Sequence, residues 1–337
     1  MKQLICQQPF QFVYEETEKP TISEGEALIR IRRIGICGTD FHAYTGNQPY
    51  FTYPRILGHE LAGEIVAIND QQSDFKVGDR VAINPYQECG KCQACKRGKT
   101  NCCAHLEVRG VHRDGGMQEY VNIPTTHLIN ANHIDLDSAA IVECLSIGAH
   151  AVRRADLTKG DFVLVIGAGP IGLGVMKLAK LAGAEVIAMD MNDQRLQFSQ
   201  EWAEVDHIVN AADNPLEKIQ QIKDGDLPVV VFDATGNKQS MESSLNYAAF
   251  GGKLVFVGLI RDDFSVYYPD YHQKELTLFS SRNATQIDFE TVLRAMGNGQ
   301  IDTESFITHK IPFSEVADQF EALMEPEANV IKAMIEL

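Results

Sequence analysis

The 337-residue sequence predicts an α/β protein in which a β-rich part precedes a doubly wound parallel sheet. The first observation is a set of short β-branched runs, bounded by Gly, Asp and Asn, at residues 25–37, 60–68 and 78–83. The second is a change of pattern at Gly160. An apolar strand, a glycine turn, a helix with apolar residues every three or four positions and a second apolar strand follow, which is a βαβ unit.

The later segments continue this pattern. Residues 227–236 and 251–259 contain apolar strand patterns that are each followed by glycine, and residues 277–285 supply a further strand. Amphipathic helical stretches follow at residues 288–299 and 314–324. The length fits two domains, each large enough to bury a core of its own.

The formal net charge of −16 argues against nucleic acid and anionic membranes as partners. The start of the sequence lacks the apolar region of a signal peptide, and no apolar run has the length of a membrane span. We therefore expect a cytoplasmic protein whose clustered cysteines bind metal rather than form disulfides. A small basic patch inside the cysteine cluster leaves a zinc-ribbon nucleic-acid module as an alternative. It consists of Lys91, Lys96, Arg97 and Lys99.

A dinucleotide site is indicated by the glycine turn between the first strand and helix of the βαβ unit. Gly167, Gly169 and Gly172 form G-x-G-x-x-G. The first makes the turn, the second lets the backbone approach a pyrophosphate, and the third lets the helix pack on the strand. Asp190 ends the second strand, where a carboxylate binds ribose hydroxyls and repels a 2′-phosphate, so NAD is favoured over NADP.

A structural zinc site is predicted by the spacing C-x2-C-x2-C-x7-C. The cysteines in this spacing are Cys89, Cys92, Cys95 and Cys103, with Cys102 as a spare, and the choice of Cys103 over Cys102 rests on the family resemblance given below. Four thiolates close a tetrahedral shell and leave no position for a substrate. This site would tie down the lobe at residues 85–106.

A second, catalytic zinc site is predicted upstream from Cys37 and His59, a pair suited to zinc. The sequence His59-Glu60 resembles the start of H-E-x-x-H, but Gly63 stands where the second histidine is needed, which excludes a metalloprotease. One further glutamate would leave a fourth position open for a substrate oxygen or water. Glu143 is a candidate for that ligand.

Together these residues resemble the zinc-dependent medium-chain alcohol and polyol dehydrogenases over essentially the whole chain. The family pattern runs in order through Cys37-Gly-Thr39-Asp, Gly58-His59-Glu60, the four cysteines, Glu143 and the glycine turn to Asp190. The resemblance implies a GroES-like catalytic domain at residues 1–148 and 287–337 and a Rossmann NAD-binding domain at residues 149–286. It also implies a dimer or tetramer. Either Glu60 or Glu143 would be the third zinc ligand.

The resemblance also implies a mechanism in which zinc lowers the pKa of the substrate hydroxyl and hydride passes to the nicotinamide. Glu143 would act in catalysis, and the proton would leave through Thr39 and His42. A packed or solvated role for His42 stays open. The cofactor contacts would come from Gly167, Gly169, Pro170, Ile171, Gly172, Asp190, Arg195, Thr235, Gly236 and Gly258.

Three stretches resemble the bacterial sugar-acid dehydrogenases of the L-galactonate, L-gulonate and L-idonate 5-dehydrogenase type. They are residues 46–60, 109–120 and 278–285. Arg282 follows an apolar strand, and its guanidinium is suited to hold a carboxylate with two hydrogen bonds. Asn283 is suited to bind a substrate hydroxyl. The alternative for Arg282 is a protein carboxylate or a subunit contact.

Other functions stay open at this stage. Within the same class, the substrate is alternatively a neutral polyol, threonine or a simple alcohol. A quinone reductase is disfavoured because such relatives lack the zinc ligands. In a different class, the protein would be a non-catalytic NAD-binding or zinc-binding module. An open zinc site with a proton path favours the enzyme.

Overall fold

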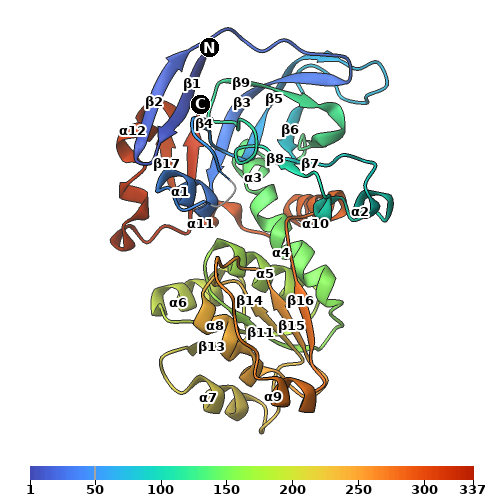
Figure 1. Ribbon diagram of the computed structural model, residues 1–337, viewed down its shortest axis with the longest axis vertical. Coiled ribbons are helices and arrows are strands. Elements are labelled where there is room, and N and C mark those ends of the chain that lie inside the picture. Colours follow the sequence, from blue (N-terminus) through green and yellow to red (C-terminus); the bar gives the residue numbers. More distant parts are fainter. Residues whose placement is uncertain (49–50) are drawn as a thin grey trace. The chain divides into compact units, whose positions relative to one another are not determined.

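The computed structural model describes residues 1–48 and 51–337, and these form two compact units. The first unit contains residues 1–144 and 285–337, and the second contains residues 145–284. Figure 1 shows strands throughout the first unit and a central sheet with helices in the second. The predicted α/β fold is confirmed: the first unit is a β-rich GroES-like body, and the second is a doubly wound Rossmann sheet.

The largest sheet of the first unit has the strand order β10-β6-β5-β3-β18-β17, with β9 also paired to β3. These strands are β3 (Glu26–Ile36), β5 (Glu60–Asn69), β6 (Arg80–Ile83), β9 (Tyr120–Pro124), β10 (Leu128–Asn130), β17 (Ile307–Pro312) and β18 (Lys332–Glu336). The segment after residue 285 thus adds two strands to a sheet begun near the N-terminus. One apolar core, which includes Ile29, Ile34, Leu61 and Ile335, packs against it.

Two small sheets complete the first unit. One joins β1 (Lys2–Gln8) to β2 (Gln11–Glu16) and β4 (Arg55–Ile56), and the other pairs β7 (Tyr86–Gln87) with β8 (Glu107–Val108). The helices are α1 (Gly38–Tyr44), α2 (Gln93–Lys96), α3 (Leu136–Ala140), α10 (Gln286–Gly297), α11 (Thr303–Phe306) and α12 (Val316–Gln319). Helix α4 (Val142–Ala155) begins in the first unit and continues into the second.

The stretch at residues 314–324, predicted as one helix, is instead broken. Helix α12 lies between two 3₁₀ turns at Phe313–Glu315 and Ala322–Met324. Val316, Phe320 and Leu323 are still buried, as helical spacing requires. Phe320 packs against the rings of Phe12, Phe41 and Tyr44, so tertiary packing determines the path of this segment rather than a continuous helical ladder.

The second unit is a six-stranded parallel sheet in the order β13-β12-β11-β14-β15-β16. Numbered within the unit this is 3-2-1-4-5-6, the order of dinucleotide-binding folds. The strands are β11 (Phe162–Ile166), β12 (Glu185–Asp190), β13 (His207–Asn210), β14 (Val230–Asp233), β15 (Lys253–Phe256) and β16 (Thr277–Ser280). Its helices are α5 (Pro170–Leu181), α6 (Asp193–Trp202), α7 (Pro215–Ile222), α8 (Lys238–Ser243) and α9 (Tyr268–Gln273).

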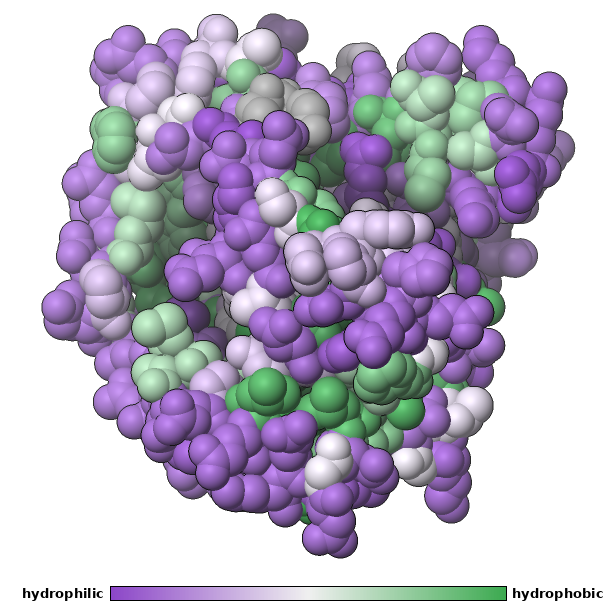
Figure 2. Space-filling model, turned by 60° about the horizontal axis from the view of Figure 1, so that its bottom comes forward, coloured by the Kyte–Doolittle hydropathy of each residue, from purple (hydrophilic) through white to green (hydrophobic). Residues whose placement is uncertain are grey.

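The face of the molecule shown in Figure 2 is largely hydrophilic. Figure 2, with the lower end of Figure 1 turned forward, shows mostly hydrophilic side chains, between which hydrophobic residues form separate groups. Among the residues that the structure describes, no helix combines the length and apolar character needed to cross a membrane.

Candidate metal and cofactor sites

The four predicted structural ligands converge in the lobe of the first unit. The sulfur atoms of Cys89, Cys92, Cys95 and Cys103 all lie within 4.8 Å of one another. Sγ of Cys92 is 3.4 Å from that of Cys95 and 3.9 Å from that of Cys103. A tetrahedron with zinc–sulfur bonds of about 2.3 Å has edges of about 3.8 Å, so this spacing fits zinc. Cys102 is exposed and lies outside the group.

Backbone amides prepare the lobe for a cation. The N–H groups of Cys95 and Ala104 lower the pKa of Cys92 to about 6, and the N–H of Lys91 lowers the pKa of Cys89. The pKa of Cys95 is raised by burial and by its contact with Cys92. The sulfur of Cys92 is therefore disposed to be a thiolate near neutral pH, which is the form that binds zinc.

A second group of ligand atoms lies where β3 ends and β5 begins. Cys37, His59 and Glu60 place one ligand atom each within 4.8 Å of one another. Strands β3 and β5 are antiparallel, with Gly35 opposite Glu60, so Cys37 directly after β3 meets the start of β5. His59 and Glu60 are buried. A thiolate, an imidazole and a carboxylate are zinc donors, and three of them leave a fourth position open.

Asp40 joins the two halves of this group. One of its carboxylate oxygens accepts a hydrogen bond from the backbone N–H of Cys37 at 2.9 Å, and the other accepts one from Gly58 at 3.1 Å. The same carboxylate lies 3.7 Å from Nδ1 of His59. Burial disfavours the charged form of His59, but Asp40, Cys37 and Glu143 together outweigh this effect and raise the pKa of the imidazole. Sequence reasoning quoted Asp40 within the family pattern but gave it no role.

Glu60 is held from its other side by Lys332, which the sequence did not single out. Nζ of Lys332 donates to both carboxylate oxygens of Glu60, at 2.7 and 2.9 Å, and to the carbonyl of Ile36 at 3.2 Å. Gly35 provides the necessary space, because a Cβ there would lie 2.0 Å from Oε2 of Glu60. This contact joins residues far apart in the chain, so no local motif signals it.

Glu143, predicted as an alternative zinc ligand, lies outside the Cys37–His59–Glu60 group. Its carboxylate accepts a hydrogen bond from the hydroxyl of Tyr86. Burial raises the pKa of Glu143, and the positive charge of His59 opposes this. Burial and the nearby Glu143 carboxylate raise the pKa of Tyr86 well above its ordinary value, so Tyr86 stays a neutral donor. Of the two candidate glutamates, the structure therefore brings only Glu60 into the metal group.

Thr39 and His42 both lie on α1, next to Cys37. They are three residues apart, and positions with this spacing share one helix face. Thr39 is half-buried and His42 is exposed. The helix therefore runs from the metal group toward solvent along the two side chains predicted to pass a proton.

The glycine turn of the second unit leads from β11 into α5. Gly167 has φ 96°, in the left-handed region, and a Cβ on Gly172 would lie 1.7 Å from the carbonyl oxygen of Gly167. Around Gly169 there is open space, with no heavy atom within 4 Å of where its Cβ would be. Helix α5 begins with Pro170 and Ile171. The free backbone N–H groups of its first turn therefore face the glycine turn, as an anion site requires.

Asp190 ends β12, on the strand next to the glycine turn. One carboxylate oxygen accepts the N–H of Ala168 at 2.7 Å, and the other accepts the N–H of Asn192 at 2.9 Å. Asp190 thus ties the turn to its own strand, and it stays partly exposed. Arg195 follows in α6 and is also partly exposed.

The remaining predicted cofactor residues lie after β14 and β15. Thr235 and Gly236 follow β14, and Gly258 follows β15. The two turns touch, because a Cβ on Gly258 would lie 2.3 Å from the amide nitrogen of Gly236. All these residues follow the carboxyl ends of parallel strands, where open α/β sheets bind ligands.

Arg282 and Asn283 lie in the second unit, separated from the end of β16 by one residue. Arg282 is exposed and Asn283 is half-buried, with φ 54°. Nδ2 of Asn283 and Oγ of the neighbouring Ser281 are buried and have no hydrogen-bond partner among the described residues. Ser281 and Asn283 therefore each offer a buried polar atom that no described residue satisfies.

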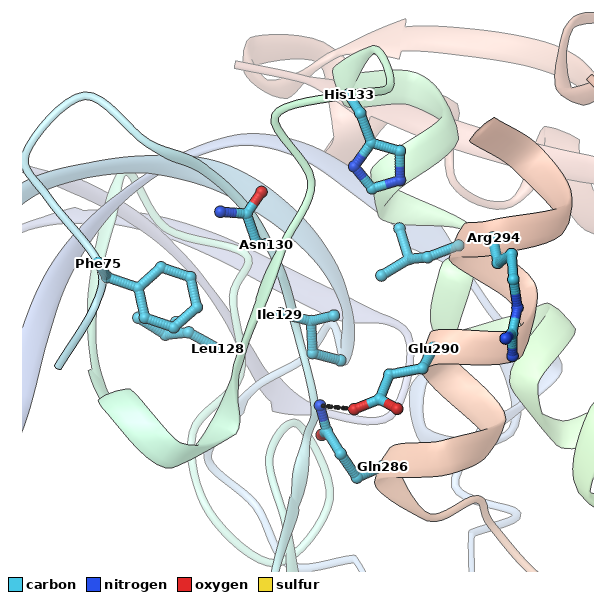
Figure 3. A pocket seen from close by; sticks show the side chains of 9 residues that line it. Phe75, Leu128, Ile129, Asn130, His133, Gln286, Glu290 and Arg294 are labelled. Atoms are coloured by element: carbon cyan, nitrogen blue, oxygen red, sulfur yellow. Dashed lines mark hydrogen bonds between the residues drawn. The ribbon is translucent and has the colours of Figure 1, made fainter. Parts of the chain in front are cut away.

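A separate cavity of about 490 Å³ lies in the first unit between the β10 segment and α10. Figure 3 shows that its polar side chains come from both segments, with Gln286 donating to Glu290 on the same helix. It contains none of the residues predicted for metal, cofactor or substrate. Its lining residues are Phe75, Leu128, Ile129, Asn130, His133, Gln286, Glu290, Leu293 and Arg294.

Two known domain families match this chain. The alcohol dehydrogenase GroES-like domain matches residues 23–133, and the zinc-binding dehydrogenase domain matches residues 170–298. L-galactonate-5-dehydrogenase of Escherichia coli K12 is 43% identical over 335 residues, which cover 99% of this chain and 98% of the relative. Sorbitol dehydrogenase of Bacillus subtilis is 30% identical over 344 residues, covering 99% and 97%.

Among solved structures, the short chain alcohol dehydrogenase RspB of E. coli CFT073, complexed with NADH, has a TM-score of 0.93. It is 32% identical, and the match covers 100% of this chain and 99% of that one. The chain belongs to the zinc-binding alcohol dehydrogenase family. The predicted class is thereby confirmed: the protein is an NAD-dependent oxidoreductase of the zinc type.

Proposed function

We propose that the protein oxidises a secondary alcohol of a sugar acid, an aldonate such as L-galactonate or L-gulonate, to the keto acid with NAD as hydride acceptor. The similarity to L-galactonate-5-dehydrogenase over nearly the whole of both chains carries this proposal. A second relative, 2-dehydro-3-deoxy-L-galactonate 5-dehydrogenase of Pseudoalteromonas atlantica, is 32% identical over 316 residues, covering 93% of this chain and 92% of the relative. Because sorbitol dehydrogenase is also similar, a neutral polyol is the second candidate.

In this proposal the first unit holds the catalytic metal and the second holds NAD. Cys37, His59 and Glu60 would bind the zinc, which when bound supplies a Lewis acid for the substrate oxygen. Asp40 orients His59, and Lys332 orients Glu60. The four lobe cysteines would hold a second, structural zinc.

The oxidation removes one hydride and one proton from the alcohol. NAD, when bound, would supply the hydride acceptor, and Thr39 and then His42 would take the proton along α1 to solvent. The half-buried position of Thr39 and the exposed position of His42 support this order. Asp190, at the end of β12, would accept the ribose hydroxyls and disfavour a 2′-phosphate.

We further propose that the protein acts in the cytoplasm as a homo-oligomer. Strand β16 is an edge of the six-stranded sheet, and three of its four residues are exposed. Leu278 on this strand and Tyr267 and Tyr268 before it are exposed large apolar side chains. An apolar edge strand with unpaired backbone groups is a natural contact between copies of a chain.

The first experiment measures initial rates of NADH formation with L-galactonate or L-gulonate and with the corresponding neutral hexitol. We expect a clearly higher kcat/KM for the aldonate, and loss of activity with a zinc chelator. A higher kcat/KM for the hexitol would show that the substrate is a neutral polyol and not a sugar acid. Failure of both substrates would contradict both candidates.

The role of Arg282 is tested in the same assay. A charge-assisted bidentate contact contributes about 1.5–3 kcal/mol, so Arg282→Ala is expected to raise KM for the aldonate about 10- to 100-fold. The hexitol, which lacks the carboxylate, should change little. Arg294→Ala, which removes an exposed arginine of the separate cavity, is the matched control. Equal weakening of both substrates by Arg282→Ala would rule out a carboxylate contact.

A further inference from the structure

Tyr86 is a buried residue of the first unit that neither the glycine turn nor the zinc motifs include. Only 5% of its surface is exposed, and its hydroxyl donates to Oε1 of Glu143, whose exposed fraction is also 5%. A buried carboxylate needs such a partner, because its charge is otherwise uncompensated. The contact therefore fixes one oxygen of Glu143 next to the metal group.

The backbone and ring of Tyr86 are themselves fixed. Tyr86 pairs with Val108 in the β7–β8 ladder at the base of the cysteine lobe, and its amide donates to Oδ1 of Asn84 at 3.0 Å. Its ring packs edge-on against Phe289 on α10, with centroids 6.2 Å apart. Strand pairing and ring packing thus fix the position from which the Tyr86 hydroxyl donates to Glu143.

Two buried glutamates are candidates for the single catalytic metal site of this region. Glu60 lies within the ligand group with Cys37 and His59, whereas Glu143 lies outside it on Tyr86. Carboxylates beside metals take their orientation from the hydrogen bonds they accept. Removal of the Tyr86 hydroxyl would leave Glu143 without this donor, beside a dication that is the strongest available partner.

We propose that Tyr86 is a positioning residue that holds Glu143 off the metal, so that Glu60 completes the protein ligand set. The proposal rests on the metal site assigned under the proposed function. It adds that the choice between the two glutamates is made by a residue at the base of the cysteine lobe. The substrate of the enzyme does not enter the argument.

The test uses full-length protein loaded with cobalt(II), whose visible d–d absorption loses intensity when the coordination number rises above four. We expect Tyr86→Phe to weaken and shift these bands, because Glu143 joins the metal. The control is Tyr44→Phe, which removes another buried tyrosine that donates to a glutamate, here Glu321 at 2.8 Å. It should leave the spectrum unchanged, and cobalt in the four-cysteine lobe contributes equally to every variant.

Two further variants identify Glu143 as the cause. Glu143→Gln alone should keep the wild-type spectrum, and the double variant Tyr86→Phe with Glu143→Gln should restore it. A wild-type spectrum for Tyr86→Phe, or a changed one that the second substitution does not restore, overturns the proposal. If Tyr86→Phe does not fold, a changed spectrum of Glu143→Gln overturns it as well. These readouts need no substrate, so they are independent of the sugar-acid assignment.

Discussion

Lys332 shows how a single buried charge stabilises the candidate metal group of Cys37, His59 and Glu60. Its side chain is 1% exposed and its partner Glu60 is fully buried. Removing one member of a buried ion pair leaves the other uncompensated, which costs about 3–5 kcal/mol. Lys332→Met is therefore expected to lower the free energy of unfolding of the metal-loaded protein by that amount, measured by urea denaturation.

The control for Lys332 is Lys177, a second lysine with a nearly buried side chain. Its partner Glu204 is 71% exposed, so water solvates that carboxylate when the lysine is lost. Lys177→Met should cost about 1 kcal/mol or less. Similar losses for the two variants would show that burial of the partner carboxylate does not determine the effect.

For single residues, the sequence predicts candidate metal ligands better than it predicts the residues that hydrogen-bond to the carboxylates of the site. Cys89, Cys92 and Cys95 are recognisable because their spacing is local. Lys332 meets Glu60 only after the chain returns to β3 through β18, and Tyr86 meets Glu143 across two elements. Since these partners are set by the fold, no spacing rule finds them.

In the turn between β11 and α5, Gly172 and Gly169 are needed for different reasons. Gly172 is needed for packing, and Gly169 is predicted to be needed for NAD binding. Gly172→Ala would force a Cβ into the carbonyl of Gly167, and overpacking of this kind costs about 3 kcal/mol. Gly169→Ala meets open space at an ordinary φ of −78°, so its cost should stay below about 1 kcal/mol. It should nevertheless weaken NAD binding about tenfold, or 1.4 kcal/mol, because the new methyl group lies where the pyrophosphate approaches.

Thermal unfolding and NAD titration of both glycine variants distinguish the two effects. Unchanged NAD affinity in Gly169→Ala would place the pyrophosphate elsewhere. A stable Gly172→Ala protein would mean that α5 can move away from β11.

Helices and strands with a clear pattern of apolar residues were predictable from the sequence. Those whose backbone path depends on tertiary packing were not. The strand at residues 162–166 is apolar throughout, the strand at residues 185–190 is apolar between its two end residues, and both appear as expected. The stretch at residues 314–324 has helical spacing but forms short turns, because its aromatic residue packs into a cluster of rings from β2 and α1. In this segment the spacing of apolar residues predicts which side chains are buried, but it does not predict that the helical hydrogen bonding is interrupted.

For the whole molecule, the exposed edge of β16 predicts association. We expect sedimentation analysis to give a dimer or tetramer, and Leu278→Glu to shift it toward monomer by placing a charge in the contact. Leu216→Glu, at an exposed leucine on α7, is the matched control. A monomeric wild-type protein would contradict the homo-oligomer, whereas an oligomer that Leu278→Glu leaves intact would move the contact away from β16.

The fold class was predictable because the sequence pattern changes near Gly160. Short β-branched runs precede this position, and alternating strand and helix patterns follow it. The strand order of the parallel sheet was not predictable, since it depends on which apolar strands pair after the chain crosses over. The return of residues 307–336 to the first sheet came only from the family resemblance.

Gly35 carries an evolutionary consequence. Since any side chain there would occupy the space of the Glu60 carboxylate, a lineage that replaced Gly35 would first have to shorten residue 60. The two positions should therefore change together or not at all, with glycine kept wherever glutamate is. A search of laboratory-evolved variants for altered metal preference would accordingly have to sample both positions in one step.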